Sequence, residues 1–454
     1  MIKCPSSLRA AQTMPRISVL ILFICLSASH ASGETIVIAP SDDLHTAVAA
    51  LSPGDELVLT AGEYLLGRGL KISLTAEEAS PSIIRAQDGD AVLIRLPSPD
   101  HNIVEIRSSR FLTIRGLRFS GGSHGLRLMD SDFITIEDCE IFETGDVAIS
   151  ANAGGTYEGL VIRRNHIHHT NGTGEGLYLG CNHDRCRVAN SLVEGNYIHH
   201  TNRASVDQGD GIEIKEGSFG NVVRDNVIHD TKYPGILTYS TAGNGPANII
   251  ERNLVWNVSD YPIQSAADAI IRNNIVLGGP VVMQAHQAGR PSNLVVAHNT
   301  IISPGAGIVV RDVSGPVQIV NNAVFAASGF AINVISSEKS MVQVEGNVGE
   351  GRLAGARNGL LQVNGIAGEL VDADYDRLPP IDVFPAPGSQ LVGSGAKAFL
   401  TAVDFNGSKR NGEADAGAYK FDENGNPGWV LQPAFKKPGI RATMPQPRTG
   451  SPAP

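Results

Sequence analysis

A short alternation of apolar and polar positions recurs through the middle of the chain. Two branched aliphatic residues are followed by charged or small residues, then an asparagine, then a second aliphatic pair. Copies of this segment begin at Val161, Leu192, Val222, Ile249 and Ile270, and weaker copies begin at Val295, Ile319 and Val344. The segments are short and rich in β-branched residues, and the sequence between them has no helical periodicity. This pattern predicts β-strands.

The asparagines give the repeat its period. They lie at Asn165, Asn196, Asn226, Asn253, Asn274, Asn299, Asn322 and Asn347, so successive spacings are 31, 30, 27, 21, 25, 23 and 25 residues. Such a repeat indicates a solenoid in which each repeat forms one rung. In a parallel β-helix, each rung satisfies the backbone groups of the next at ~4.8 Å. We therefore predict an all-β, right-handed, single-stranded parallel β-helix. Eight asparagines in phase disfavour the alternative, a β-sandwich.

The asparagine of each rung is expected to hydrogen-bond to the next one along the axis. We also expect it to turn the corner of the rung, because asparagine tolerates the left-handed backbone region. The composition fits a narrow solenoid: aromatic residues make up only 5% of the chain, and the 50 glycines among 454 residues supply the many turns.

Residues 1–31 are predicted to be a secretory signal peptide. Basic residues precede an apolar run over residues 17–26, and small residues near Ala31 offer a cleavage site. The apolar run is too short to span a membrane. Met14 could be the true start, because the sequence from Met14 is by itself a compact signal peptide. The mature protein is therefore expected to be secreted or periplasmic.

The remaining chain divides into four segments. Residues 32–116 are expected to form an N-terminal cap and the first rungs, with a short helix over residues 43–51 that plugs the open end of the core. Residues 117–350 are the predicted β-helix core, and residues 351–421 are predicted C-terminal rungs or a cap. Residues 422–454 are rich in proline and glycine and are expected to be disordered or loosely docked.

The net charge of −10, without a basic stripe, makes nucleic acid an unlikely partner. An acidic protein can still bind an anionic polysaccharide if a local cation cluster or a metal ion supplies the attraction. We expect a monomer without a membrane span.

Three cysteines follow the predicted signal peptide. Cys139 is aligned with the asparagine column and is expected to be buried. Cys181 and Cys186 enclose a short loop, for which a disulfide is the favoured prediction in an oxidising compartment. A zinc site with His183 and Asp184 is the alternative, although one such cysteine pair is a weak metal signal.

Each rung carries a second strand whose outward positions form columns. One predicted column contains Arg127, Ile149, Tyr178, Glu213, Leu237 and Gln264, and a neighbouring column contains Lys215 and Tyr239. Just before these strands, Asp146, Glu175 and Asp210 fall at equivalent positions of three consecutive rungs. Stacked carboxylates repel one another unless a cation joins them, so a Ca²⁺ site is one interpretation. Solvated turn residues are the alternative.

Lys215 is a candidate general base, because neighbouring aromatic residues could desolvate its amine. The loops that feed this surface are long and polar, which is typical of a binding groove. Arg203 and His200 lie on them and are candidate substrate-binding residues, together with Arg127 and Gln264. For the histidine pairs at residues 168–169 and 199–200, a structural role at the rung corners is favoured over a catalytic or metal-binding one.

Parts of the sequence resemble a known family. The segments LHTAVAALSPGDELVLTAGEY and FLTIRGLRFSGG are similar to the N-terminal pattern of β-helical polysaccharide lyases of the chondroitinase B and alginate lyase type. The segment GDGIEIKEGSFGNVVRDNVIHDTKYPGILTYS, residues 209–240, resembles the active-site rungs of that family. The broader resemblance, to bacterial right-handed β-helix proteins with a pectate-lyase-like solenoid, covers residues 41–325.

The resemblance implies β-elimination on a polymer that contains uronic acid. Lys215 matches the lysine base of the family, whereas the position of the assisting arginine falls at Tyr239 or Ser240. In this hypothesis calcium neutralises the substrate carboxylate, Lys215 with Glu213 beside it removes the proton, and Tyr239 or Tyr178 protonates the leaving oxygen. A C5-epimerase, a glycoside hydrolase and a non-catalytic carbohydrate-binding or surface solenoid remain as alternatives.

Overall fold

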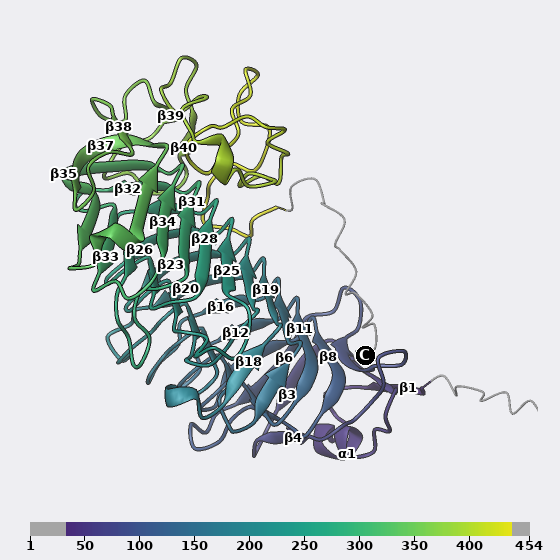
Figure 1. The fold of residues 1–454 in the computed structure, drawn as a ribbon. Helices are drawn as coiled ribbons and strands as arrows, with labels where there is room; N and C mark the ends of the chain where they lie inside the picture. Colours follow the sequence, from purple (N-terminus) through teal and green to yellow (C-terminus); the bar gives the residue numbers. More distant parts are fainter. Residues whose placement is uncertain (1–32, 438–454) are drawn as a thin grey trace, which may run out of the picture. The chain divides into compact units, whose positions relative to one another are not determined.

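The computed structural model describes residues 33–437. Within this range the chain forms parallel strands that stack rung upon rung, as Figure 1 shows for β8, β11, β19, β25, β28 and β31. The predicted all-β parallel solenoid is confirmed, with about 13 turns. The predicted signal peptide lies outside the described residues.

Each complete rung contributes one strand to each of three faces, which we name A, B and C. Face A is a sheet of 13 strands, and the last eight of them, from β15 on, each precede one of the repeated asparagines. Its strands are β1 (Thr35–Ile38), β2 (Glu56–Leu59), β5 (Ser82–Ala86), β8 (Arg110–Arg115), β11 (Asp132–Glu137), β15 (Val161–Arg163), β19 (Leu192–Glu194), β22 (Val222–Arg224), β25 (Asn248–Glu251), β28 (Ala269–Arg272), β31 (Leu294–Ala297), β34 (Val317–Val320) and β36 (Val342–Glu345).

Faces B and C join into one sheet of 23 strands, because the long strand β35 (Ala323–Ile335) pairs with both. Face B also contains β3 (Gly62–Leu65), β6 (Val92–Leu96), β9 (Arg118–Gly121), β12 (Glu140–Phe142), β16 (His166–His168), β20 (Tyr197–Thr201), β23 (Val227–Thr231), β26 (Leu254–Val258), β29 (Ile275–Leu277), β32 (Thr300–Ser303), β37 (Asn347–Ala354) and β38 (Leu360–Gln362). Face C contains β4 (Leu70–Ile72), β7 (Val104–Arg107), β10 (Leu126–Met129), β13 (Ile149–Ala151), β17 (Leu177–Leu179), β21 (Ile212–Ile214), β24 (Ile236–Thr238), β27 (Ile263–Ser265), β30 (Val281–Met283) and β33 (Ile308–Arg311).

The smaller elements lie outside these faces. They are the parallel pair β14 (Thr156–Glu158) and β18 (Arg187–Ala189), the antiparallel pair β39 (Leu370–Asp372) and β40 (Asp382–Pro385), the 3-10 turns Asn182–Asp184, Lys339–Met341 and Lys397–Phe399, and α1 (Leu44–Ala49). Helix α1 begins at the predicted place: the Asp43 side chain accepts hydrogen bonds from the backbone of His45 and Thr46. Leu44 and Val48 pack into the core at the first rungs, as expected for a cap.

The asparagine ladder is continuous from Asn165 to Asn347. Asn253 shows its geometry: its Oδ1 accepts from the backbone and side-chain nitrogens of Asn226 at 3.0 Å, while its Nδ2 donates to Asn274 Oδ1 and to a backbone carbonyl, both at 3.0 Å. Cys139 caps the ladder, since its backbone nitrogen donates to Asn165 Oδ1. The asparagines do not themselves turn the corner. The residue before each one does, for example Arg164, Asp225 and Arg252 with φ of 53°, 57° and 57°.

The C-terminal segment folds back over the outer surface of face B. Trp256 on β26 and Phe325 on β35 pack in one apolar cluster with Phe384 and Leu431. Lys436 is buried, and its Nζ donates to Asp225 Oδ1 at 2.8 Å. The expectation of a loosely docked tail is therefore wrong for residues 422–437, and residues 438–454 lie outside the described range. The buried apolar side chains of this segment, rather than its proline and glycine content, determine that it docks on face B.

Candidate functional site

The Lys215 group lies on face C, where β17, β21 and β24 are neighbours. Tyr178 on β17 pairs with Glu213 on β21, and Lys215 and Tyr239 directly follow β21 and β24. The Lys215 Nζ donates to Glu213 Oε1 at 2.6 Å and to the Tyr239 hydroxyl at 3.1 Å, and it lies 4.6 Å from the centres of both tyrosine rings. The predicted catalytic side chains are thus in mutual contact.

Three carboxylates converge beside this lysine. Glu175, Asp210 and Glu213 are buried, and one oxygen of each lies within 4.8 Å of the others. Within the described part of the chain, each has a buried oxygen without a hydrogen-bond partner. Burial raises the pKa of Glu175 to about 7, and burial together with Glu213 and Glu175 raises the pKa of Asp210. This arrangement suits a shared proton or a bound cation, either of which relieves the repulsion.

Asp146 is not part of that convergence. β13 pairs Ile149 with Leu177, and β17 pairs Leu177 with Ile212, so Glu175 and Asp210 align with Val147, and Asp146 lies one position earlier. Asp146 instead reaches Glu175 through Thr173, whose hydroxyl lies 2.5 Å from Asp146 Oδ1 and 2.6 Å from Glu175 Oε2. One hydroxyl donates only one hydrogen bond. A protonated Glu175 that donates to Thr173, while Thr173 donates to Asp146, satisfies the set.

A loop from a later rung closes over Lys215, whose side chain is only 5% exposed. His286 on this loop, residues 284–290, has its Nε2 2.9 Å from the Tyr239 hydroxyl. Gln287 bonds the backbone nitrogen of His183 at 2.8 Å and the side chain of Asn182 at 2.7 Å. The sequence pattern does not indicate His286 as a site residue, although its loop interrupts the repeat.

The loop that Gln287 contacts is closed by a disulfide between Cys181 and Cys186, and Cys139 is free and buried. Both sulfurs of the pair are therefore bonded to one another rather than arranged as zinc ligands. Because the disulfide loop and residues 284–290 meet above Lys215, they form one cover over the site.

Burial also affects the protonation of the aromatic groups in this site. The pKa values of Tyr178 and Tyr239 are raised by burial and by the Glu213 carboxylate, which keeps both phenols protonated. Burial and the Lys215 charge lower the pKa of His286. The Tyr239 hydroxyl is thus a proton donor held between Lys215, Glu213 and His286.

The predicted substrate-binding residues are spread over two surfaces. Arg127 and Gln264 share the outward column of face C, in which the order is Arg127, Ser150, Tyr178, Glu213, Leu237 and Gln264. Arg203 instead pairs with Glu143 at 2.7 Å, and His200 Nδ1 lies 2.6 Å from His199 Nδ1. Arg203 and His200 therefore belong to the surroundings of face B, away from the Lys215 contacts.

Face B carries a ladder of stacked rings on its outer side. Phe142, His168, His199, His229 and Trp256 follow one another on successive rungs with ring centres 4.2 to 5.3 Å apart. Burial and neighbouring imidazoles lower the pKa of His199 to about 2. The histidines at residues 168 and 199 thus stack on rings of neighbouring rungs. The ladder also contains Phe142, His229 and Trp256, which the two histidine pairs in the sequence did not indicate.

Comparison with known proteins identifies the family to which this fold belongs. The sequence matches a family model described as right handed beta helix region over residues 80–205 and 202–348, more than half of the 454-residue chain. The stacked parallel rungs define a β-solenoid of the right-handed class. The chain belongs to this right-handed β-helix family.

Solved structures of polysaccharide-modifying enzymes share the fold. A pectate lyase, Pel9A, has a TM-score of 0.50 and 13% identity over 86% of this chain and 97% of its own. A mannuronic acid specific polysaccharide family 6 lyase from human gut microbiota has a TM-score of 0.50 and 14% identity over 74% and 92%. The A-module of the Azotobacter vinelandii mannuronan C-5 epimerase AlgE6 has a TM-score of 0.52 and 15% identity over 70% and 93%. At these identities the similarity shows the fold alone.

No curated protein matches the sequence. Among the described residues, no helix is both long enough and apolar enough to cross a membrane.

Proposed function

We propose that this protein is an exported polysaccharide lyase that cleaves a polymer containing uronic acid by β-elimination. The observation that carries the proposal is the contact between Lys215, Glu213 and Tyr239 beside a cluster of three buried carboxylates. This set supplies a base, a proton donor and a place for a cation within one face of a rigid solenoid. The sequence resemblance of residues 209–240 to lyase active-site rungs supports the same activity.

Each side chain has a role in the elimination. The Lys215 amine takes the C5 proton of the uronate, after passing its own proton to Glu213. The electrons of the C5–H bond form the C4=C5 double bond as the C4–O bond breaks. The leaving oxygen receives the proton of the Tyr239 hydroxyl, and Tyr178 packs against Lys215 to exclude water. Tyr239 or Ser240 stands where the resembled family has an arginine, so charge stabilisation here must come from elsewhere.

The carboxylate cluster fits a calcium ion. Glu175 and Asp210 offer hard oxygen ligands, and Glu213, whose Oε1 receives the lysine proton, offers its other oxygen, Oε2. The buried oxygens without hydrogen-bond partners on all three residues are the kind of group that a cation satisfies. A bound Ca²⁺ would neutralise the substrate carboxylate and so make its C5 proton more acidic. In this proposal the cover formed by the disulfide loop and residues 284–290 opens to admit the polymer.

A uronan C5-epimerase is the second candidate, and the position of His286 favours it. His286 contacts the Tyr239 hydroxyl at 2.9 Å, so Tyr239 and His286 form a second acid–base pair beside Lys215. Epimerisation needs one group to remove the C5 proton and another to return a proton on the opposite side of the ring. In that reaction the C4–O bond of the substrate stays intact, and the polymer is not cleaved.

The test is ultraviolet absorbance of the unsaturated uronate, with alginate, pectate and chondroitin as substrates, in the presence of Ca²⁺ or a chelator. Wild-type protein is expected to form the chromophore from one of them. Lys215→Met alone leaves Glu213 buried without its cation, which costs about 3–5 kcal/mol of stability. The double variant Lys215→Met with Glu213→Gln removes both charges, so it should fold but have no activity. Full activity in the folded double variant would exclude Lys215 as the base.

A further inference from the structure

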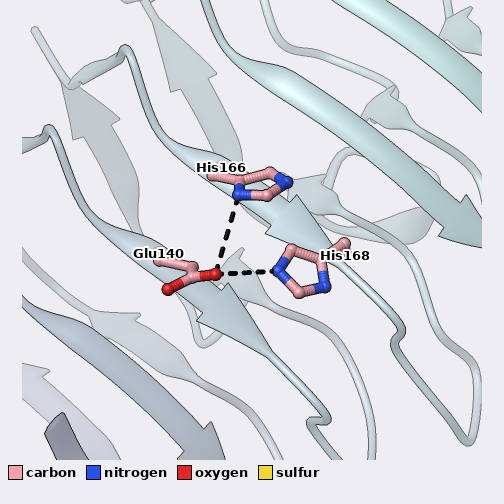
Figure 2. Close-up of side chains that lie close together, drawn as sticks. All are labelled: Glu140, His166 and His168. Atoms are coloured by element: carbon pink, nitrogen blue, oxygen red, sulfur yellow. Dashed lines mark hydrogen bonds and ion pairs between the residues drawn. The ribbon is translucent and has the colours of Figure 1, made fainter. Parts of the chain in front are cut away.

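The outer side of face B carries a group of metal-ligand side chains that the proposed lyase reaction does not use. Glu140 lies on β12, and His166 and His168 lie on β16 in the next rung (Figure 2). Residues two apart on a strand project from the same face, so both imidazoles point outward. Glu140 pairs directly with His166 in the parallel ladder, which brings its carboxylate between them.

One carboxylate oxygen meets both rings. Glu140 Oε1 lies 3.1 Å from His168 Nε2 and 3.7 Å from His166 Nδ1, and the three candidate ligand atoms are within 4.8 Å of one another. Ligand atoms around a tetrahedral ion with bonds of 2.0–2.1 Å are separated by roughly 3.3 Å. The two distances from Glu140 Oε1, 3.1 Å and 3.7 Å, lie on either side of that value, and the two imidazole nitrogens are within 4.8 Å of one another, so the side chains need to rotate only to bring the nitrogens to the same spacing.

Each of these three side chains also makes a hydrogen bond through the atom that would not bind the ion. Arg118 donates to the other oxygen of Glu140. The Nε2 of His166 lies 2.8 Å from Nε2 of His199, and the Nδ1 of His168 lies 2.7 Å from Nδ1 of His169. Partners of this kind orient ligands in metal sites and fix the imidazole tautomers.

The tautomers required for metal binding are mutually consistent. His166 presents the Nδ1 lone pair if its Nε2–H donates to His199, and His199 can then donate from Nδ1 to His200, whose Nδ1 is 2.6 Å away. His168 presents the Nε2 lone pair if its Nδ1–H donates to His169. All these imidazoles can be neutral at once. A cation would then replace one contact, the hydrogen bond between His168 Nε2 and Glu140 Oε1 at 3.1 Å, and leave the bonds to His199 and His169 in place.

We propose that Glu140, His166 and His168 bind a divalent transition-metal ion such as Zn²⁺. Two imidazoles and one carboxylate suit borderline ions of this class, whereas Ca²⁺ prefers sites made only of oxygen. The site is separate from the Lys215 group, and its ligands are half-buried, so an ion can reach them from solvent. The cysteines nearest in sequence to these ligands contribute nothing, because Cys181 and Cys186 are joined and Cys139 is buried.

The experiment is a Zn²⁺ titration of the intact protein, after removal of metals by chelator, with competition against a chromophoric indicator. Wild-type protein should bind Zn²⁺ at one site, and His168→Gln and Glu140→Gln should each weaken this binding at least tenfold. Glu140→Gln is nearly isosteric, so it tests the site even if His168→Gln fails to fold. His101→Gln, at an exposed histidine outside face B, is the matched control and should leave affinity unchanged.

Three further measurements decide the outcome. Excess Ca²⁺ should not displace the zinc, and the double variant at Lys215 and Glu213 should bind it normally. X-ray absorption at the zinc edge should show nitrogen and oxygen ligands without sulfur. If wild-type protein shows no zinc site stronger than that of the His168→Gln variant, or if zinc binds at His200, His229 and Asp230 instead, the proposal is overturned and the histidines are a structural ladder.

Discussion

The substitution Glu175→Gln tests the electrostatics of the carboxylate cluster through its effect on stability. Glu175 is fully buried, and its pKa is raised from 4.5 to about 7. The folded state therefore holds this proton more tightly than the unfolded state does. Between about pH 4.5 and 7, wild-type stability falls as pH rises, and it stays lower above pH 7. Glutamine carries no charge at any pH and escapes this loss.

The size of the effect follows from the shift. A change in pKa from 4.5 to about 7 corresponds to about 3 kcal/mol, at 1.36 kcal/mol per unit. In chelator, the variant should therefore be up to about 3 kcal/mol more stable than wild type at pH 8, and nearly equal to it at pH 4.5. Glutamine also keeps the hydrogen bond to Thr173, which limits other effects. Urea unfolding followed by circular dichroism at several pH values measures the difference.

Glu137 provides a control of opposite sign. Its buried carboxylate pairs with Arg115, Arg163 and Arg164 at 2.6 to 2.9 Å, and these charges lower its pKa. Its contribution to stability is present above about pH 4.5 and is lost as pH falls through the lowered pKa. Glu137→Gln should therefore destabilise the protein at pH 8. The burial of a protonated Glu175 would be wrong if the Glu175→Gln variant is less stable than wild type at pH 8. It would also be wrong if the difference in free energy of unfolding between the two proteins does not change with pH.

Two further substitutions test the fold. Asn253→Ala removes four buried hydrogen bonds of the ladder and should cost about 3 kcal/mol or more, whereas Asn202→Ala, on an exposed loop, should change little in the same urea titration. Leu431→Ala should cost about 2–5 kcal/mol because Leu431 is fully buried in the C-terminal cluster, while Val430→Ala, 53% exposed, should be nearly neutral. Equal losses from both members of either pair would contradict the packing described.

The repeat made the fold predictable from sequence. A side chain that recurs once per rung must stack on its neighbours, so the eight asparagines located the last eight strands of face A and the corner that follows each of them. The backbone at that corner was not predictable from the asparagine alone. The left-handed conformation falls on the residue before it, where arginine, aspartate and histidine all occur.

The candidate site was predicted only where the register was regular. Glu175, Asp210, Glu213, Lys215 and Tyr239 come from rungs that the repeat aligns, and the structure brings them together. Asp146 precedes those rungs, and the one-residue difference there placed it wrongly, because side chains alternate with period two. The burial of Lys215 depends on residues 284–290, a loop whose path no strand pattern specifies. The docking of residues 422–437 likewise depends on contacts distant in sequence.

Removal of the C5 proton of a uronate by the Lys215 group can be measured by solvent isotope exchange. A uronan is incubated in D₂O with wild-type protein and with the Lys215→Met, Glu213→Gln double variant, and the products are analysed by mass spectrometry. Wild-type protein should yield unsaturated chain ends or deuterium at C5, and the folded double variant should yield neither. Polymers that emerge from wild-type protein uncleaved and without deuterium, across alginate, pectate and chondroitin, would contradict it.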